Sequence, residues 1–173
     1  TVSSDTLINC YAPVHHVHNK NVALHKSYGI SIDNSVSDSL KAKAFIAQIG
    51  DKEQTIYRGG KWIDGKLTAK LKSFGDYSVA IDTLAPTIKP LNIYPNKHMT
   101  SSALKINVRD DLSGIKTYRA EIDGEWVLME FDPKKARLTH YFKKSLPKGE
   151  HTFTLEIIDD RKNIAHYQVR FVR

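Results

Sequence analysis

Cysteine is the scarcest chemistry-bearing residue in this sequence. Cys10 is the single cysteine among 173 residues, so an internal disulfide is excluded. A metal site made of several thiolates is excluded for the same reason. Hydrophobic residues make up 40% of the chain and charged residues 26%, which is ordinary for a folded protein and unlike a disordered one.

Long apolar runs are absent as well. No segment is long and apolar enough to cross a bilayer, and residues 1–10 lack the apolar core of a signal peptide. We therefore predict that the chain is not transmembrane. Because it begins with Thr1 and not with methionine, we expect a mature or excised piece, and its end within a strand-like segment is typical of a natural terminus.

The sequence also lacks the usual catalytic motifs. There is no G-x-S-x-G motif, no local Cys-His signature, and no pair of carboxylates whose spacing differs from ordinary turn usage. Gly59 and Gly60 lack the rest of a phosphate-binding loop. We therefore predict a chain without catalytic residues and without a cofactor of its own.

Positive charge is in excess, mostly in the second half. The formal charge is +7: residues 1–85 hold 10 Lys+Arg and 8 Asp+Glu (+2), and residues 86–173 hold 16 and 11 (+5). Clusters occur only at residues 134–137 and 143–144, neither is interleaved with aromatic residues, and acids lie among the other bases. We predict solvated strand faces and no nucleic-acid partner, with an acidic glycan or an anionic membrane as the alternative.

Turn residues and apolar alternation predict three consecutive antiparallel strands between residues 109 and 142. A turn at 110–114 precedes a strand at 115–122, and Asp123-Gly124 between apolar runs is a strong hairpin signal. Alternation over 125–131 predicts one continuous strand. Residues 132–135 then form a loop, and Leu138, His140 and Phe142 predict the next strand, with these three side chains on one face.

The rest of the chain repeats this pattern. Strands are predicted at 6–12, 41–49, 67–71, 74–81, 104–109, 151–158 and 165–172, and no convincing helix is found. Phe153, Leu155 and Ile157 are predicted to face inward. Two prolines four residues apart, within 82–90, predict a short linker. We expect an all-β protein of two consecutive immunoglobulin-like antiparallel β-sandwich domains, 1–85 and 86–173.

Histidines gather near the start of the chain. His16 and His18 form an H-x-H pair, which on a strand places both imidazoles on one face, as a zinc site requires. His25 and Asp33 are the nearest candidates for further ligands, but they form no recognisable motif. A small zinc hydrolase on His16 and His18 is one interpretation, and a polar loop at a domain edge is the other.

Two other groups suggest binding. Asp110, Asp111, Asp159 and Asp160 lie on two turns that could meet and bind calcium, although aspartate in turns commonly caps backbone amides. Five aromatic residues could form a platform for sugar rings: Trp62, Tyr57, Trp126, Tyr118 and Tyr141. Strand aromatics more often belong to cores or cross-strand pairs, and a buried Trp62 and Trp126 would exclude the platform for those residues.

Several short motifs together resemble a known family. They are Asp-Asp-Leu-Ser-Gly-Ile at 110–115, Ile-Asp-Gly-Glu-Trp-Val at 122–127, Phe-Asp-Pro-Lys at 131–134, Lys-Gly-Glu-His at 148–151, Asp-Asp-Arg-Lys-Asn at 159–163, Gly-Gly-Lys-Trp at 59–62, Asp-Gly-Lys-Leu at 64–67 and Phe-Gly-Asp-Tyr-Ser-Val at 74–79. The set resembles the tandem immunoglobulin-like C-terminal region of lysostaphin-like zinc metallopeptidases of the Gram-negative envelope. Lys162 stands where that family usually has glycine.

The resemblance implies a non-catalytic accessory region. Those peptidases hold zinc with an H-x-x-x-D pair and a later H-x-H, but H-x-x-x-D is absent here and H-x-H occurs once, at residues 16–18. The implied partners are an upstream peptidase domain of the same polypeptide and the cell wall, and the implied location is the periplasm or the outer envelope after export. A glycan- or peptidoglycan-binding module is the alternative function.

Overall fold

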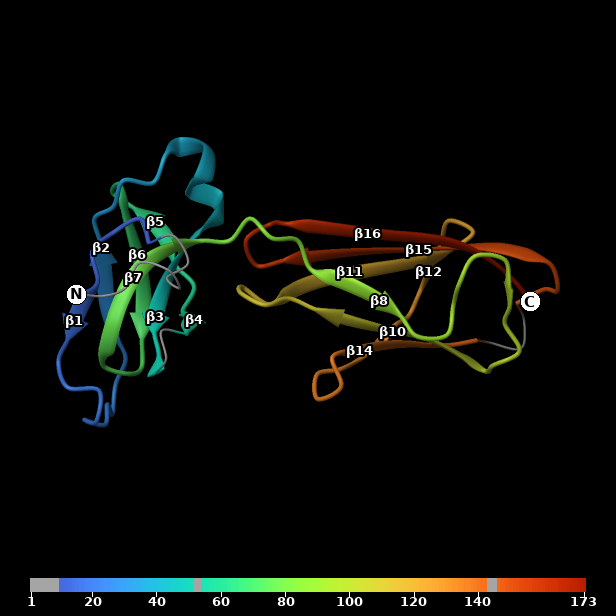
Figure 1. The fold of residues 1–173 in the computed structure, drawn as a ribbon, viewed down its shortest axis with the longest axis horizontal. Coiled ribbons are helices and arrows are strands. Elements are labelled where there is room, and N and C mark those ends of the chain that lie inside the picture. Colours follow the sequence, from blue (N-terminus) through green and yellow to red (C-terminus); the bar gives the residue numbers. More distant parts are fainter. Residues whose placement is uncertain (1–9, 52–53, 143–145) are drawn as a thin grey trace. The chain divides into compact units, whose positions relative to one another are not determined.

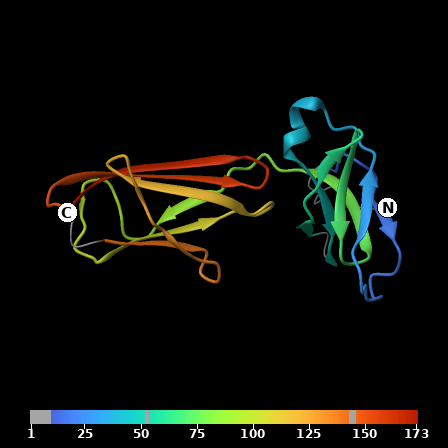
Figure 2. The same cartoon turned by 180° about the vertical axis from the view of Figure 1, so that it is seen from behind.

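The computed structural model describes residues 10–51, 54–142 and 146–173. Within these ranges nearly all regular structure is strand, and η1 (Asp38–Lys43) is a short 3₁₀ helix, which confirms the predicted all-β fold. The chain divides into two compact units, Thr1–Thr83 (unit 1) and Leu84–Arg173 (unit 2). Each unit contains its own pair of sheets (Figure 1, Figure 2). No described helix is long and apolar enough to span a membrane.

Unit 1 is a sandwich of two antiparallel sheets. The four-stranded sheet has the order β1-β7-β3-β4 and the three-stranded sheet the order β2-β6-β5. The strands are β1 (His15–Val17), β2 (Tyr28–Ile32), β3 (Ala44–Ile49), β4 (Thr55–Tyr57), β5 (Lys61–Ile63), β6 (Lys66–Leu71) and β7 (Gly75–Ile81). Buried side chains from both sheets, such as Ile46 and Leu67, form one apolar cluster.

The sequence misplaced two strands of unit 1. The strand predicted at 41–49 begins at Ala44, because η1 occupies the preceding residues. Of the strand predicted at 6–12, residues 6–9 lie outside the described part and residues 10–12 are not in a strand; β1 begins at His15. Alternation over residues 41–46 predicted a strand from Lys41, but a period of two does not fix the residue at which strand pairing begins.

Unit 2 is a second two-sheet sandwich. Its sheets have the orders β13-β14-β10-β8 and β12-β11-β15-β16-β9. The strands are β8 (Thr87–Pro90), β9 (Lys97–His98), β10 (Ala103–Arg109), β11 (Ile115–Ile122), β12 (Glu125–Val127), β13 (Glu130–Asp132), β14 (Arg137–Tyr141), β15 (Glu150–Asp159) and β16 (Ile164–Val172). Phe153, Leu155 and Ile157 face its core, as predicted.

The predicted hairpin at Asp123-Gly124 is confirmed, but the single strand predicted after it is wrong. Asp123 (φ 54°) and Gly124 (φ 83°) both have positive φ and join β11 to β12, as in the tight hairpin turns that favour Asp-Gly. Pairing then stops after Val127. Leu128 and Met129 carry the chain to the other sheet, where β13 pairs with β14. We call this change of sheet the crossover.

Part of the segment predicted as a linker belongs to unit 2. Residues 87–90 form β8, which pairs with β10 at the edge of its sheet. Pro90 has no amide hydrogen to donate, and an edge strand is where a sheet tolerates that loss. The two prolines at 86 and 90 therefore mark an edge strand as well as the approach to it.

Candidate functional site: an apolar pocket beside the crossover

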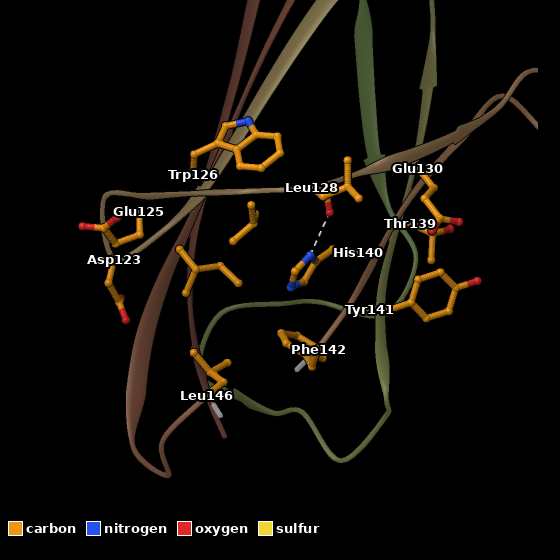
Figure 3. A pocket seen from close by; sticks show the side chains of 12 residues that line it. Asp123, Glu125, Trp126, Leu128, Glu130, Thr139, His140, Tyr141, Phe142 and Leu146 are labelled. Atoms are coloured by element: carbon orange, nitrogen blue, oxygen red, sulfur yellow. Dashed lines mark hydrogen bonds between the residues drawn. The ribbon is translucent and has the colours of Figure 1, made fainter. Parts of the chain in front are cut away.

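A pocket of about 610 Å³ lies beside the crossover of unit 2 (Figure 3). This volume is in the range of protein sites that hold small ligands. The pocket is lined by residues of β11, the turn after it, β12, the crossover, β13, β14 and the segment after β14: Ile122, Asp123, Glu125, Trp126, Val127, Leu128, Glu130, Thr139, His140, Tyr141, Phe142 and Leu146. We call it the crossover pocket.

The pocket exists because two short strands leave neighbouring strand ends uncovered. β12 pairs only with Ala120–Ile122 of β11, and β13 pairs with residues 137–139 of β14. His140 and Tyr141 continue β14 beyond that pairing, while they remain paired with β10 on the other side. The sandwich is therefore open on the side where the chain changes sheets.

Three large apolar side chains at the pocket are exposed to solvent. Trp126 is 58% exposed, Leu128 59% and Tyr141 58%. Ile122, Val127 and Phe142 line the pocket between them and pack against the core of unit 2. Trp126 and Tyr141 lie on opposite sides of His140 and Phe142 (Figure 3). The arrangement offers an apolar recess with an exposed aromatic side chain at two of its rims, and not a flat aromatic platform.

His140 brings a polar atom into the recess. Its side chain is 8% exposed and packs edge-on against Phe142, with 5.3 Å between ring centres. Nδ1 lies 2.9 Å from the carbonyl oxygen of Leu128 and donates to it, because a carbonyl only accepts. The other nitrogen, Nε2, points into the pocket (Figure 3). When the ring is neutral, Nε2 is therefore an acceptor facing a ligand.

The remaining titratable groups lining the pocket are acidic. Asp123, Glu125 and Glu130 all line it, although the unit as a whole is basic. Asp123 is compensated by His151, whose Nδ1 lies 2.6 Å from a carboxylate oxygen of Asp123. Among the described residues, neither Glu125 nor Glu130 has an ion-pair partner. Among the described lining residues, these two glutamates are therefore the charges without an ion-pair partner.

His151 holds the turn below the pocket as a cation. Nδ1 faces Asp123 at 2.6 Å and Nε2 faces the carbonyl oxygen of Pro147 at 2.9 Å, so both nitrogens donate. Burial lowers the pKa of His151, but the hydrogen bonds to Asp123 and Pro147 outweigh it and the net pKa is raised. Burial raises the pKa of Asp123, but its bonds to His151 and to the Thr152 amide lower the net value.

The structure brings together part of the predicted aromatic group. Trp126 and Tyr141 flank the pocket, and Tyr118 supports the crossover by donating to the carbonyl oxygen of Met129 at 3.2 Å. Trp62 and Tyr57 belong to unit 1. Trp62 is half-buried and donates to the Lys41 carbonyl oxygen at 2.8 Å, and Tyr57 packs on Phe45, so both act within unit 1.

The predicted zinc pair does not converge. β1 ends at Val17, and His18 has φ 54°, so the two-residue strand period does not extend to it. His16 pairs with Asp76 at 2.6 Å, and His18 stacks on Phe74 with 4.6 Å between ring centres.

The predicted further ligands do not complete that site. Asp33 forms an ion pair with Lys66 at 3.2 Å, and His25 is exposed. Among the described residues, no histidine belongs to a group of three potential metal ligands.

The two predicted aspartate turns do meet, and they act mainly as caps. The Asp160 amide donates to the Gly114 carbonyl oxygen at 3.1 Å, and carboxylate oxygens of Asp110 and Asp159 lie within 4.8 Å of each other. Asp110 accepts from the Gly114 amide at 2.6 Å, and Asp159 accepts from the amides of Arg161 and Asn163, both at 2.8 Å.

The outer aspartates of these turns face cations. Asp111 pairs with Arg109 at 2.6 Å, and Asp160 pairs with Arg161 at 2.6 Å and with Lys116 at 3.4 Å. The four aspartates are thus used by backbone amides, Asn163 and basic side chains, which matches the turn-capping alternative.

The basic cluster at residues 134–137 contributes no side chain to the pocket lining. Lys134 and Lys135 are in the turn between β13 and β14, where both amides donate to Asp132 and the Lys135 ammonium lies 3.5 Å from its carboxylate. Residues 143–144 lie outside the described residues.

Sequence reasoning missed His140 and Leu128 as site residues. The signal for His140 was present, because strand alternation placed it on the same face as the apolar Leu138 and Phe142. A histidine on an apolar strand face must find a partner, and the Leu128 carbonyl supplies it. Leu128 had no such signal, since its exposure follows from the change of sheet.

Comparison with known families concerns unit 1. Residues 1–82 match the family model of the Zu5-like domain, so this part of the chain is similar to that family. The match ends within one residue of the end of unit 1, at Thr83. No curated protein matches the chain.

Proposed function

We propose that the chain is a non-catalytic binding region and that unit 2 binds its ligand in the crossover pocket. The observation that carries this proposal is the exposure of Trp126, Leu128 and Tyr141 around an apolar recess. Exposed apolar side chains that gather at a concave surface gain free energy when a ligand removes them from water. His140 and the two glutamates add the few polar groups that orient a ligand in such sites.

The histidine arrangement supports a non-catalytic role. His16 and His18 contact Asp76 and Phe74 separately, and in the part of the chain that the structure describes neither is joined by further potential zinc ligands. The resemblance to the accessory region of envelope metallopeptidases extends the proposal: the binding region would hold an upstream peptidase domain near its target after export. This extension is supported by the turn and strand motifs that occur in both halves of the chain.

A glycan ligand is the second candidate, because Trp126 and Tyr141 are exposed at one site. Aromatic rings can stack on the apolar faces of sugars. Against it, Ile122, Val127 and Leu128 provide few partners for the many hydroxyl groups of a sugar.

The proposal is tested with indole as a probe of the pocket. In ¹H–¹⁵N spectra of the intact chain, indole should shift the amides of residues 122–128 and 139–142 in a saturable way. Trp126→Ala and Leu128→Ala should abolish the shifts, whereas Ile164→Ala, which truncates another exposed apolar residue of unit 2, should not. Shifts spread evenly over the chain, or unchanged in Trp126→Ala, would remove the proposed site.

A further inference from the structure

We propose that the ligand of the crossover pocket is a polypeptide segment that inserts one tyrosine or tryptophan side chain and carries lysine or arginine on both sides of it. This inference rests on the proposed function and names its partner class. It follows from the shape of the recess, the acceptor in it, the charge at its mouth and the free strand edges beside it.

The shape favours a single bulky side chain. The recess is lined by Phe142 and aliphatic residues, and the exposed side chains of Trp126 and Tyr141 lie at opposite rims of it (Figure 3). An aromatic ring placed there would contact apolar atoms on several sides, and aromatic pairs add attraction beyond the area that they bury. A flat platform, as sugar stacking favours, would need Trp126 and Tyr141 on the same side.

The acceptor selects among aromatic side chains. His140 donates from Nδ1 to Leu128, and no described residue donates to Nε2 in the recess. A tyrosine hydroxyl or a tryptophan indole N–H could donate to it, whereas phenylalanine would leave it without a partner. Because an unsatisfied polar atom in an apolar site is costly, we expect the pocket to prefer tyrosine and tryptophan.

The charge at the mouth selects the flanking residues. Glu125 and Glu130 both line the pocket and are exposed. Glu125 is the first residue of β12 and Glu130 the first residue of β13, so one lies before the crossover and one after it. Asp123 is already paired with His151. Cations on both sides of the inserted ring would therefore meet one glutamate each, in a unit whose basic excess repels cations elsewhere.

Free strand edges explain why the ligand would be a polypeptide. β12 is the outermost strand of its sheet, so one side of its backbone has no strand partner among the described residues. The Phe142 amide donates to Ser102 of the β10 side at 2.9 Å. Backbone groups alternate along a strand, so those of Tyr141 point the other way, toward the pocket. An extended segment could pair with these groups while its side chain fills the recess.

The test is calorimetric titration of the intact chain with short synthetic peptides. One series keeps lysines on both sides and varies the central residue among Trp, Tyr, Phe and Ala; a second keeps Trp and replaces the lysines by glutamates. We expect Trp and Tyr to bind about fivefold tighter than Phe, and at least about tenfold tighter than Ala. Glutamate flanks should cost about tenfold, with a loss that shrinks in high salt.

Charge reversal gives a matched control. In Glu125→Lys/Glu130→Lys the preference should invert, so that the glutamate-flanked peptide binds more tightly than the lysine-flanked one. Glu150→Lys, a reversal at an exposed glutamate of unit 2 outside the pocket, should leave the original preference. All three replaced glutamates are exposed, so folding is expected to be unaffected.

The outcomes separate this inference from the proposed function. If indole shifts the pocket amides but no peptide binds below about 1 mM, the pocket binds a different ligand and the inference is wrong. The same holds if flanking charge has no effect, or if a soluble peptidoglycan fragment binds more tightly than every peptide and loses binding in Trp126→Ala. If indole also fails, the proposed function itself is wrong.

Discussion

His140 and His151 are both buried in unit 2, but their hydrogen bonds give them different chemistry. His140 donates from one nitrogen and leaves the other facing the pocket. His151 donates from both nitrogens, to Asp123 and to the Pro147 carbonyl oxygen; burial lowers its pKa, but these bonds outweigh burial and favour the protonated form in the folded state. His140 can therefore form a hydrogen bond with a ligand, whereas His151 holds the turn at Asp123 through hydrogen bonds within unit 2.

The His151 cation makes the stability of unit 2 depend on pH. Its folded pKa is raised above 6.5, so its contribution is complete below about pH 6.5 and is lost as the pH rises through the folded pKa. Asp123, which faces it, has a lowered pKa and stays ionised there, while the nearby Arg173 cation opposes protonation. Unit 2 should therefore unfold at lower urea concentration at pH 9 than at pH 6.

The matched variant for this prediction is His151→Gln, which cannot titrate. Its urea midpoint for unit 2 should be lower at pH 6 and should change less between pH 6 and pH 9. Hydrogen exchange of the β15 and β16 amides in urea assigns the transition to unit 2. An equal pH dependence in both proteins would place the titrating group elsewhere.

Lys162 is strained by its backbone conformation. It has φ 61° in the turn between β15 and β16, a region that costs residues other than glycine about 1–2 kcal/mol. Lys162→Gly should stabilise unit 2 by about 0.5–1 kcal/mol after the added entropy of the unfolded glycine is subtracted. Lys162→Ala, which keeps a Cβ, should give no such gain in urea unfolding. If alanine stabilised as much as glycine, side-chain contacts and not φ would be the cause.

At the scale of single residues, the sequence predicted turn chemistry well. Asp123-Gly124 forms the predicted hairpin, and aspartates in turns cap backbone amides, because these effects depend on neighbouring residues alone. The H-x-H prediction assumed one strand through both histidines, and that assumption is wrong because β1 ends at Val17, directly before His18.

At the scale of elements, the crossover decides the site. Alternation of apolar residues over 125–131 is unbroken in the sequence, yet the backbone changes sheet at Leu128 and Met129. A period of two reports which face a side chain occupies, and it does not report which strand the backbone pairs with. The pocket could therefore not be predicted, although Trp126 and Tyr141 were singled out as candidate ligand contacts.

The β11–β12 hairpin that carries Trp126 depends on Gly124. A methyl group added there would meet no atom within 4 Å, so Gly124→Ala tests the φ of 83° and not packing. We expect a loss of about 1 kcal/mol, measured as faster hydrogen exchange in β11 and weaker indole binding. Gly29→Ala is the matched control, since its added methyl is also free of contacts but its φ is not positive. An equal loss in both variants would contradict the argument from φ.

At the scale of the whole molecule, the sequence predicted the all-β class because turn signals and strand-length runs recur along both halves. The structure divides the chain after Thr83, near the predicted linker. The sequence analysis predicted the net charge of each half of the chain, and not the charge at the pocket. The second half carries the basic excess, but the acidic residues that line the pocket all lie within residues 123–130, and a total charge does not report such a local group.

Each unit has a core made of its own residues, which leads to a prediction about unfolding. Phe153 and Leu67 are fully buried, in unit 2 and unit 1 respectively. Phe153→Ala should cost unit 2 about 3–5 kcal/mol, and Leu67→Ala should cost unit 1 about 2–5 kcal/mol, because each leaves a cavity in a packed core.

Hydrogen exchange measured strand by strand in the intact chain separates the two effects. Phe153→Ala should speed exchange in β11, β15 and β16 while leaving β3 and β7 near their original rates, and Leu67→Ala should do the reverse. Similar acceleration in both units from either substitution would mean that the chain unfolds as one cooperative body. In that case the pocket's stability would depend on unit 1, and indole binding would weaken in Leu67→Ala although that residue lies outside the pocket lining.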